Sequence, residues 1–144
     1  MKPCLADVNF LLPLLVRTHT HHAPALGWWN QQEPGQIGLC RIVQLSVVRL
    51  LSNQRVMQGH EMRARTAWDL PTELLSDERM EFWAEPAGLE EVFPRLLRYS
   101  VPTQALVADA YLAAFAIGRQ SGIVTFDRGF QQFAGLSLEL LESQ

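Results

Sequence analysis

Five short apolar segments that suit buried strands alternate with helical patterns along the chain, and no other feature of the sequence constrains the fold as strongly. The predicted strands span residues 3–9, 37–40, 79–86, 121–127 and 136–142, the last as a terminal edge strand. Helical patterns occupy residues 10–16, 22–32, 40–51, 61–75, 88–99, 104–120 and 128–133. Strands that alternate with helices in this way predict a three-layer α/β/α sandwich with a mainly parallel central sheet.

The composition narrows the class of protein. A chain of 144 residues, 48% of them hydrophobic, suits one compact domain over residues 1–144. The net charge of −3 gives no global basic signal, so contact with a nucleic acid would need a local patch. Lys2 is the only lysine, which excludes a P-loop, a Schiff-base enzyme and a receiver domain.

Cysteine usage and hydropathy bear on the compartment. Cys4 and Cys40 each lie beside an apolar run without CxxC spacing, which favours buried free thiols in a reducing compartment. No run approaches the roughly 18 apolar residues of a membrane span. We expect a cytoplasmic protein that makes no membrane contact.

One helical segment places an amide on its apolar face. At helical period Gln44 shares a face with Val47, Val48 and Leu51 in the segment CRIVQLSVVRLL. A neutral amide is therefore predicted to point inward, where a polar group needs a partner.

Three aspartates have unusual settings. Asp7 and Asp127 come at the carboxyl ends of the first and fourth predicted strands, and these ends face the ligand crevice of a parallel sheet. Asp109 lies in the middle of the most apolar helix, where a carboxylate is costly unless it is paired or coordinated to a cation. If the three converge, oxygen-only ligands favour Mg²⁺ or Mn²⁺ over zinc, and Mg²⁺ suits phosphodiester chemistry. In the alternative structural interpretation, Asp7 and Asp127 are turn or cap residues and Asp109 bonds a nearby backbone group.

Three motifs occur in a fixed order: LADVNFLL at the start, DAYLAAFA in the long helix and IVTFDRGF at the fourth strand. Together they make the chain resemble a PIN-domain protein, specifically a VapC-like toxin of a type II toxin–antitoxin system. The resemblance implies an α/β/α sandwich and an endoribonuclease that depends on Mg²⁺ or Mn²⁺. It also implies cleavage of RNA, commonly tRNA or rRNA, a VapB-like antitoxin partner whose C-terminal segment enters the site, and a homodimer.

The resemblance assigns site residues by position. Asp7, Asp109 and Asp127 match three of the family's four usual acids and would be the metal ligands. Gln44 stands where the fourth acid, usually a glutamate, is expected. Thr125 completes the predicted catalytic set as a polar residue beside the metal, with Asn9 in support.

Two departures from the family pattern lower the negative charge of the site. They are Gln44 and Gly129, the second standing where a further aspartate is common. An amide cannot act as a base or offset metal charge, so we predict weaker metal affinity than in a four-acid relative.

The spacing of other polar and aromatic residues allows further assignments. His19, His21 and His22 favour a polar turn and a helix start, with Thr20 as N-cap, over a metal or acid–base site. Adjacent Trp28 and Trp29 predict one core ring and one ring in a dimer or antitoxin groove. Basic residues near the predicted site are candidates for RNA phosphate contacts, first Arg128 and Arg41, then Arg49, Arg63 and Arg65.

Two other functions compete with the nuclease. A PIN-like RNA- or protein-binding module with weakened or lost catalysis would explain Gln44, but three aspartates and Thr125 are retained. A haloacid-dehalogenase-type phosphatase needs Asp-x-Asp at the first strand and a later lysine. The sequence there is Asp7-Val8-Asn9, and no later lysine exists.

Overall fold

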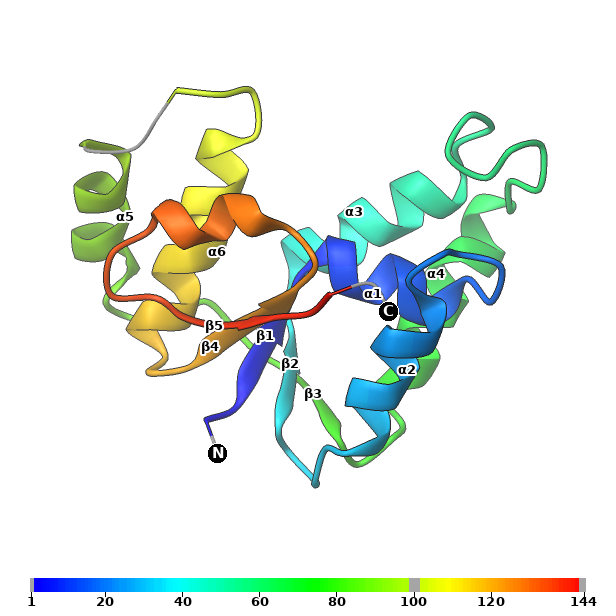
Figure 1. The fold of residues 1–144 in the computed structure, drawn as a ribbon, viewed down its shortest axis with the longest axis horizontal. Helices are drawn as coiled ribbons and strands as arrows, with labels where there is room; N and C mark the ends of the chain where they lie inside the picture. The colour runs from blue at the N-terminus through cyan, green and yellow to red at the C-terminus, as the bar shows by residue number, and fades with distance from the viewer. Residues whose placement is uncertain (1, 99–101, 143–144) are drawn as a thin grey trace.

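The sheet at the centre of the molecule is entirely parallel. The computed structural model describes residues 2–98 and 102–142, and its five strands lie in the order β3-β2-β1-β4-β5 (Figure 1). The strands are β1 (Cys4–Ala6), β2 (Ile37–Leu39), β3 (Met80–Phe82), β4 (Gly122–Thr125) and β5 (Ser137–Leu140). The predicted mainly parallel sheet is confirmed, and the last strand lies at a sheet edge as expected.

Helices cover both faces of this sheet. They are α1 (Val8–Leu15), α2 (His22–Asn30), α3 (Arg41–Leu51), α4 (Ala64–Leu74), α5 (Leu89–Arg98) and α6 (Leu106–Gly118), with a 3₁₀ helix η1 (Arg128–Gln132). The connections from β1 to β2 and from β2 to β3 run toward the β3 edge of the sheet. The connections from β3 to β4 and from β4 to β5 run toward the β5 edge. Because crossovers are right-handed, α1 to α4 form one layer and α5, α6 and η1 form the other (Figure 1).

The strand order reverses between β1 and β4. From β1 the chain passes to β2 on one side, and from β4 it passes to β5 on the other. A ligand crevice opens at the carboxyl ends of the strands where such a reversal occurs. Asp7 and Asp127 follow these two strands, so the topology places both beside the crevice.

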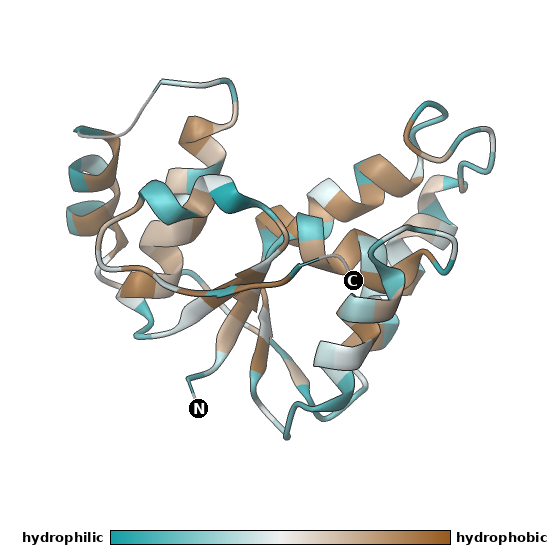
Figure 2. Cartoon of the chain, in the orientation of Figure 1, coloured by the Kyte–Doolittle hydropathy of each residue, from teal (hydrophilic) through white to brown (hydrophobic). Residues whose placement is uncertain are grey.

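The core is formed by the central strands and the helix faces that cover them, which Figure 2 colours as hydrophobic. Trp28 packs edge-on against Phe10, and Arg79 stacks over Trp29. Both tryptophans are buried within this one chain. The prediction that one of them faces a partner groove is therefore wrong, because the layer of α1 to α4 accommodates both rings.

Several boundaries differ from the predicted ones. Helix α1 begins at Val8 rather than Phe10, and the first strand stops at Ala6. Helix α4 runs from Ala64 to Leu74 through Pro71, which is buried, so the predicted interruption does not occur. The predicted N-cap at Thr20 is also wrong, because the residue directly before α2 is His21. Tyr99, the last residue of the predicted helix 88–99, lies outside the described residues.

The third strand is shorter than predicted and turns different residues inward. Phe82 is 42% exposed, whereas Trp83, one residue beyond the strand, is buried. The indole of Trp83 lies over Gly38 of β2, and a Cβ at Gly38 would overlap its ring. A glycine opposite a large ring is not visible as strand alternation, so the pattern misassigned this edge.

Both thiols are free and buried, as predicted. Across the described ranges, every helix is too short or too polar to span a bilayer.

Candidate active site

Asp7 is the most deeply buried carboxylate of the site. It follows β1 directly and is 2% exposed, and its backbone N–H bonds the Val124 carbonyl of β4 at 3.2 Å. The Thr125 hydroxyl donates to Asp7 Oδ2 at 2.7 Å, and the Asn9 amide donates to the same oxygen at 3.1 Å. Burial raises the pKa of Asp7, and these hydrogen bonds oppose that rise.

Thr125 links the two strand-end aspartates. Its hydroxyl oxygen accepts from the Asp127 backbone N–H at 2.9 Å while its hydrogen is given to Asp7. Asp127 is half-buried, and its Oδ1 accepts from the Gly129 N–H at 2.8 Å at the start of η1. The end of β4 thus orients both carboxylates through one buried hydroxyl.

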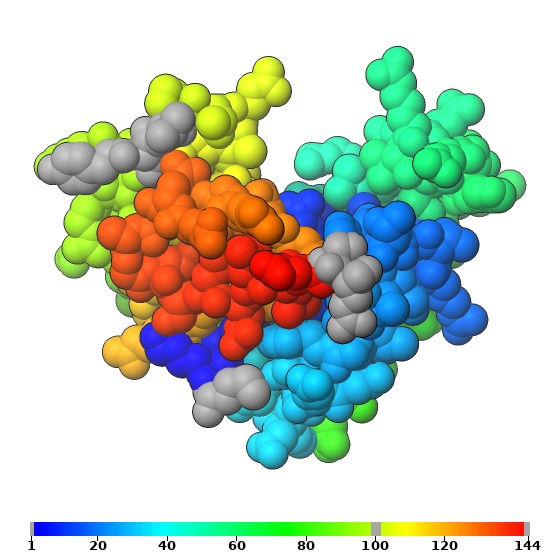
Figure 3. All heavy atoms as spheres, viewed as in Figure 1, coloured from blue at the N-terminus to red at the C-terminus, as the bar shows by residue number. Residues whose placement is uncertain are grey.

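Asp109 is electrostatically coupled to the other two aspartates. It lies in the first turn of α6 rather than in the middle of the helix as predicted, because α6 begins only at Leu106, and it is half-buried. Burial, then the negative charges of Asp7 and Asp127, raise the pKa of Asp109 to about 6. Figure 3 shows the hollow above these elements, between the yellow and orange segment of α6 and η1 and the cyan and green segment of α3 and α4.

The chemistry of this cluster fits a hard divalent cation. It presents carboxylate and hydroxyl oxygens, and no lysine or arginine of the described ranges forms an ion pair with any of the three aspartates. Within residues 2–98 and 102–142, no three His, Cys, Asp or Glu side chains are grouped so that they could hold a metal ion. Mg²⁺ commonly takes one or two carboxylates and completes its shell with water. The ligand set of Asp7, Asp109 and Asp127 therefore stays a prediction.

Gln44 is buried as predicted, and its partners come from the protein. It is 1% exposed, and Arg41 Nη1 donates to its Oε1 at 2.6 Å. Its Nε2 donates to the Thr72 hydroxyl of α4 at 3.3 Å, and that hydroxyl donates to the Trp68 carbonyl at 2.7 Å. The amide is thus engaged at both ends, and its role beside a metal stays a prediction.

The two leading arginine candidates for RNA contact lie at different places. Arg41 starts α3, and its guanidinium lies over the rings of Phe82, at 4.7 Å, and Trp68, at 5.7 Å. Arg128 is exposed and lies 4.0 Å from the Glu142 carboxylate. Within the described part of the chain, neither guanidinium forms an ion pair with an aspartate of the site, and both assignments stay predictions.

The sequence pattern missed two features, a ring pair near Asp127 and the partner of Gln44. The rings of His21 and Phe126 stack with centroids 4.5 Å apart, and both line a cavity of about 420 Å³ together with Asn9 and Asp127. The pattern makes Phe126 a strand residue and His21 part of a turn, so no spacing signal joins them. Thr72 as the partner of Gln44 gives no signal either, because its pairing depends on the packing of α4 against α3.

Comparison with known proteins gives concordant results. The PIN domain family model matches residues 4–136. Ribonuclease VapC41 of Mycobacterium tuberculosis is 36% identical over 142 residues, covering 95% of this chain and 97% of that protein. Ribonuclease VapC29 of the same organism is 31% identical, with 91% and 90% covered.

Solved structures share the fold at lower identity. Mycobacterium tuberculosis VapC20, described as a Sarcin-Ricin loop cleaving toxin, superposes with a TM-score of 0.67 at 19% identity, covering 93% of this chain and 96% of that chain. The DNA-bound VapBC of Salmonella typhimurium gives a TM-score of 0.67 at 14% identity, covering 96% and 98%.

Proposed function

Because the chain belongs to the PIN-domain family and to its VapC ribonuclease branch, we propose that it is an endoribonuclease toxin that depends on Mg²⁺ or Mn²⁺. The observation that carries the proposal is the cluster at the strand reversal, where one buried hydroxyl orients Asp7 and Asp127 and Asp109 is coupled to both. Carboxylates placed together without a protein cation are suited to a divalent metal.

Each polar side chain of the site has a separate role in the proposed reaction. Asp7 and Asp127 would hold the cation, with Asp109 beside them, and the cation when bound would supply Lewis-acid activation of the scissile phosphate. Thr125 and Asn9 fix the Asp7 carboxylate through their hydrogen bonds, which orients it before substrate arrives. The pKa of Asp109, raised to about 6, would allow this carboxyl to exchange a proton near neutral pH.

The proposed substrate is a structured cellular RNA, with tRNA or rRNA as the leading classes. The description of VapC20 as cleaving the sarcin-ricin loop supports an RNA substrate for a protein of this fold. The proposed partner is a VapB-like antitoxin, since similar structures include VapBC complexes. Homodimerisation and a cytoplasmic location belong to the same proposal.

A second candidate is a PIN-like module with weakened catalysis that binds RNA or protein. One observation favours it: Gln44, in the position of an expected acid, is held by Arg41 and Thr72. The two candidates differ in whether the protein turns over RNA.

Purified protein and expression in a bacterium test the proposal together. Wild type should cleave total RNA with Mg²⁺ or Mn²⁺ and lose this activity when EDTA is added, and induction should arrest growth. Asp7→Ala should abolish both cleavage and arrest, while Asp69→Ala, which removes a partly exposed carboxylate of α4, should change neither. Absence of cleavage with arrest unchanged in Asp7→Ala would leave the binding module as the function.

A further inference from the structure

A row of three cavities passes the candidate active site. The cavity of about 420 Å³ that contains Asn9 and Asp127 shares His21 and Phe126 with a second cavity of about 300 Å³, which Arg128 and Glu142 also line. It shares His19 with a third, of about 540 Å³. The shared lining residues make the three cavities neighbours, and we call them together the groove, with Asp127 lining its middle part.

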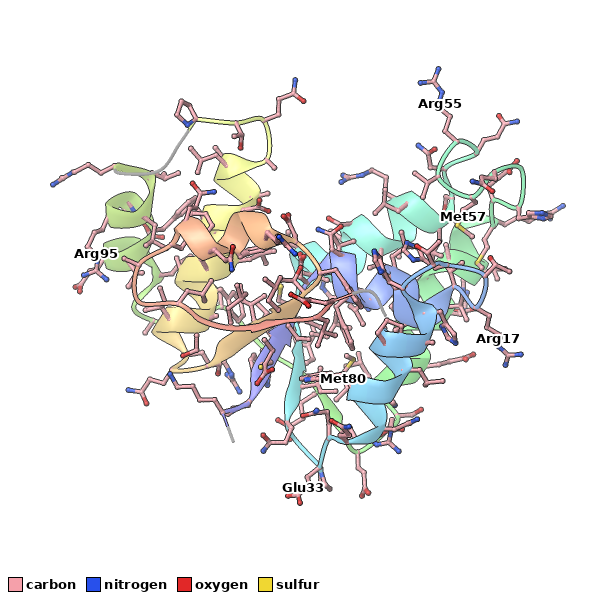
Figure 4. All side chains as sticks on the ribbon, viewed as in Figure 1. Arg17, Glu33, Arg55, Met57, Met80 and Arg95 are labelled. Carbon is pink, nitrogen blue, oxygen red and sulfur yellow. The ribbon has the colours of Figure 1, made fainter. Side chains whose placement is uncertain are left out.

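The far end of the groove lies between the α1–α2 turn and the loop that joins α3 to α4. Its lining includes Thr18, Met57 and His60. Figure 4 labels Met57 in this loop and shows Arg17 and Arg55 extending outward close by. Both arginines are exposed and adjoin lining residues in the sequence. Cationic side chains therefore border this end, which suits a polyanion.

The middle of the groove is built around a ring pair. The His21 and Phe126 planes are inclined by only 17°, and the pair lines the cavity containing Asp127 as well as the one containing Arg128. Among the described residues, His21 Nδ1 is buried and has no hydrogen-bond partner. A buried polar atom without a partner is uncommon, and it is satisfied when a ligand supplies the missing hydrogen bond.

The neighbouring histidines explain why this ring is held in place. His19 Nδ1 accepts from the His21 backbone N–H at 3.0 Å, which fixes the turn that carries the ring. His22 Nδ1–H donates to the Pro13 carbonyl at 2.9 Å, which anchors the start of α2 to α1. Of the three histidines, His21 therefore has the stacked ring and the unsatisfied nitrogen.

These features match the chemistry of an unpaired nucleobase. Sequence-dependent RNA recognition uses splayed bases that stack on aromatic or histidine rings and hydrogen-bond through their edges. A base in a duplex has both faces covered and could not use such a pair. An extended peptide would leave the stacking face unused, whereas the side chains of Asn9, His19 and His21 at the centre of the groove can hydrogen-bond a base edge.

We propose that His21 and Phe126 hold an unstacked base of single-stranded RNA next to the scissile phosphate, with His21 Nδ1 reading its edge. The inference rests on the proposed nuclease function and adds to it a specificity-determining pair for the same site. Duplex RNA, whose bases are stacked, is excluded from the groove.

The experiment uses the full chain and a pool of single-stranded RNA with random sequence. Wild type should cut the pool with a base preference at a nucleotide flanking the cut, read by sequencing the cleaved ends. His21→Ala should raise KM about tenfold, since loss of one base stack is worth that much or more, with kcat within about threefold and the preference weakened. His21→Phe restores a ring without the nitrogen, so it should recover KM but not the preference.

His22→Asn is the matched control, because it changes a histidine of the same turn and keeps a donor for the Pro13 carbonyl. It should retain the wild-type KM and preference, and thermal unfolding will show that each variant is folded. An unchanged KM and preference in folded His21→Ala would overturn the inference. So would a His21→Ala defect confined to antitoxin binding, which would assign the groove to a protein partner.

A binding measurement separates this inference from the nuclease proposal. Fluorescence anisotropy of labelled random single-stranded RNA, in EDTA and with Asp7→Asn protein, needs no turnover. His21→Ala in that background should weaken binding about tenfold. If wild type fails to cleave while this difference is found, the nuclease proposal fails and the base site stands. If wild type cleaves and the difference is absent, the base site fails and the nuclease proposal stands.

Discussion

Helices α1 and α3 begin in the same way and hold polar groups in opposite ways. Each starts just after the carboxyl end of a parallel strand, α1 after β1 and α3 after β2. At α1 the buried group is the carboxylate of Asp7, which receives neutral donors from Thr125 and Asn9. At α3 the buried group is the amide of Gln44, which receives a cationic donor from Arg41.

The difference shows where an external cation would be stabilised. Around α1 the negative charges of Asp7 and Asp127 add to burial in raising the pKa of Asp109, and within the described ranges no protein cation pairs with the three carboxylates. Around α3, among the described residues, the charged side chain bonded to the amide is Arg41, which would repel a metal. The proposed cation would therefore bind on the α1 side, whereas the buried amide on the α3 side already has its partners within the protein.

Replacing the carboxylate of the α1 side should have the largest effect. Asp7→Asn keeps the size of the side chain and an acceptor for Thr125, but removes the charge that would hold the metal. RNA cleavage should fall by more than about 100-fold, beyond the usual loss for residues that only orient metal ligands. Stability at pH 7 should not fall, because burial disfavours the ionised form. Chemical denaturation and a cleavage assay check both; a large loss of stability would make Asp7 a structural residue.

The hydroxyl beside Asp7 should have the next largest effect. Thr125→Val removes a donor to Asp7 and leaves the Asp127 N–H without its acceptor. Cleavage should fall about 10- to 100-fold, and unfolding should become easier by about 2 kcal/mol. Thr72→Val is the same substitution on the α3 side, where it removes the acceptor of Gln44 Nε2, and it should leave cleavage within about threefold of wild type. Equal losses in the two variants would remove the distinction between the two sides.

The third prediction concerns pH and the third carboxylate. The pKa of Asp109 is about 6 in the folded protein against 3.8 ordinarily, so the folded state binds its proton more tightly than the unfolded state. In the metal-free protein, the contribution of Asp109 to stability should therefore be greatest below about pH 4. It should be lost as pH rises through about 6. The loss should be about 1 kcal/mol, because the half-buried group is screened by solvent.

Urea denaturation between pH 4 and pH 7 measures this dependence. Asp109→Asn should show a smaller fall across the window than wild type, and saturating Mg²⁺ should reduce the fall in wild type. Identical pH profiles for the two metal-free proteins would mean that Asp109 is not coupled to Asp7 and Asp127.

The elements that sequence predicted well are those whose signal is local. The long apolar helix containing Asp109 and the buried strand before Asp127 carry their pattern in their own residues, and both formed where expected. The third strand formed within its predicted span, but its end was misassigned, because Trp83, one residue beyond the strand, packs on Gly38 of another strand. Helix α4 passes through Pro71 because the surrounding packing holds it, which propensity does not register.

The same division applies to the site. Strand-end position identified Asp7 and Asp127 as neighbours, since in a parallel sheet that position depends only on strand order. The partners of Gln44 depend on how α4 packs against α3, and the stacking of His21 on Phe126 depends on a turn far away in sequence. Contacts of this kind arise from tertiary packing, so a single sequence gives no periodic signal for them.

The smallest effect is expected on the α3 side, from restoring the acid. In Gln44→Glu the new carboxylate would lie within reach of Arg41 Nη1, which is 2.6 Å from the present Oε1, and would be neutralised there. Isothermal titration of Mn²⁺ should therefore show a gain in affinity of less than about threefold for the single variant. Adding Arg41→Ala should raise the affinity severalfold more in this background than in wild type, because the carboxylate is then free to act on the cation. A tenfold gain from Gln44→Glu alone would place Gln44 in the metal site despite Arg41, and no gain even in the double variant would separate α3 from the metal altogether.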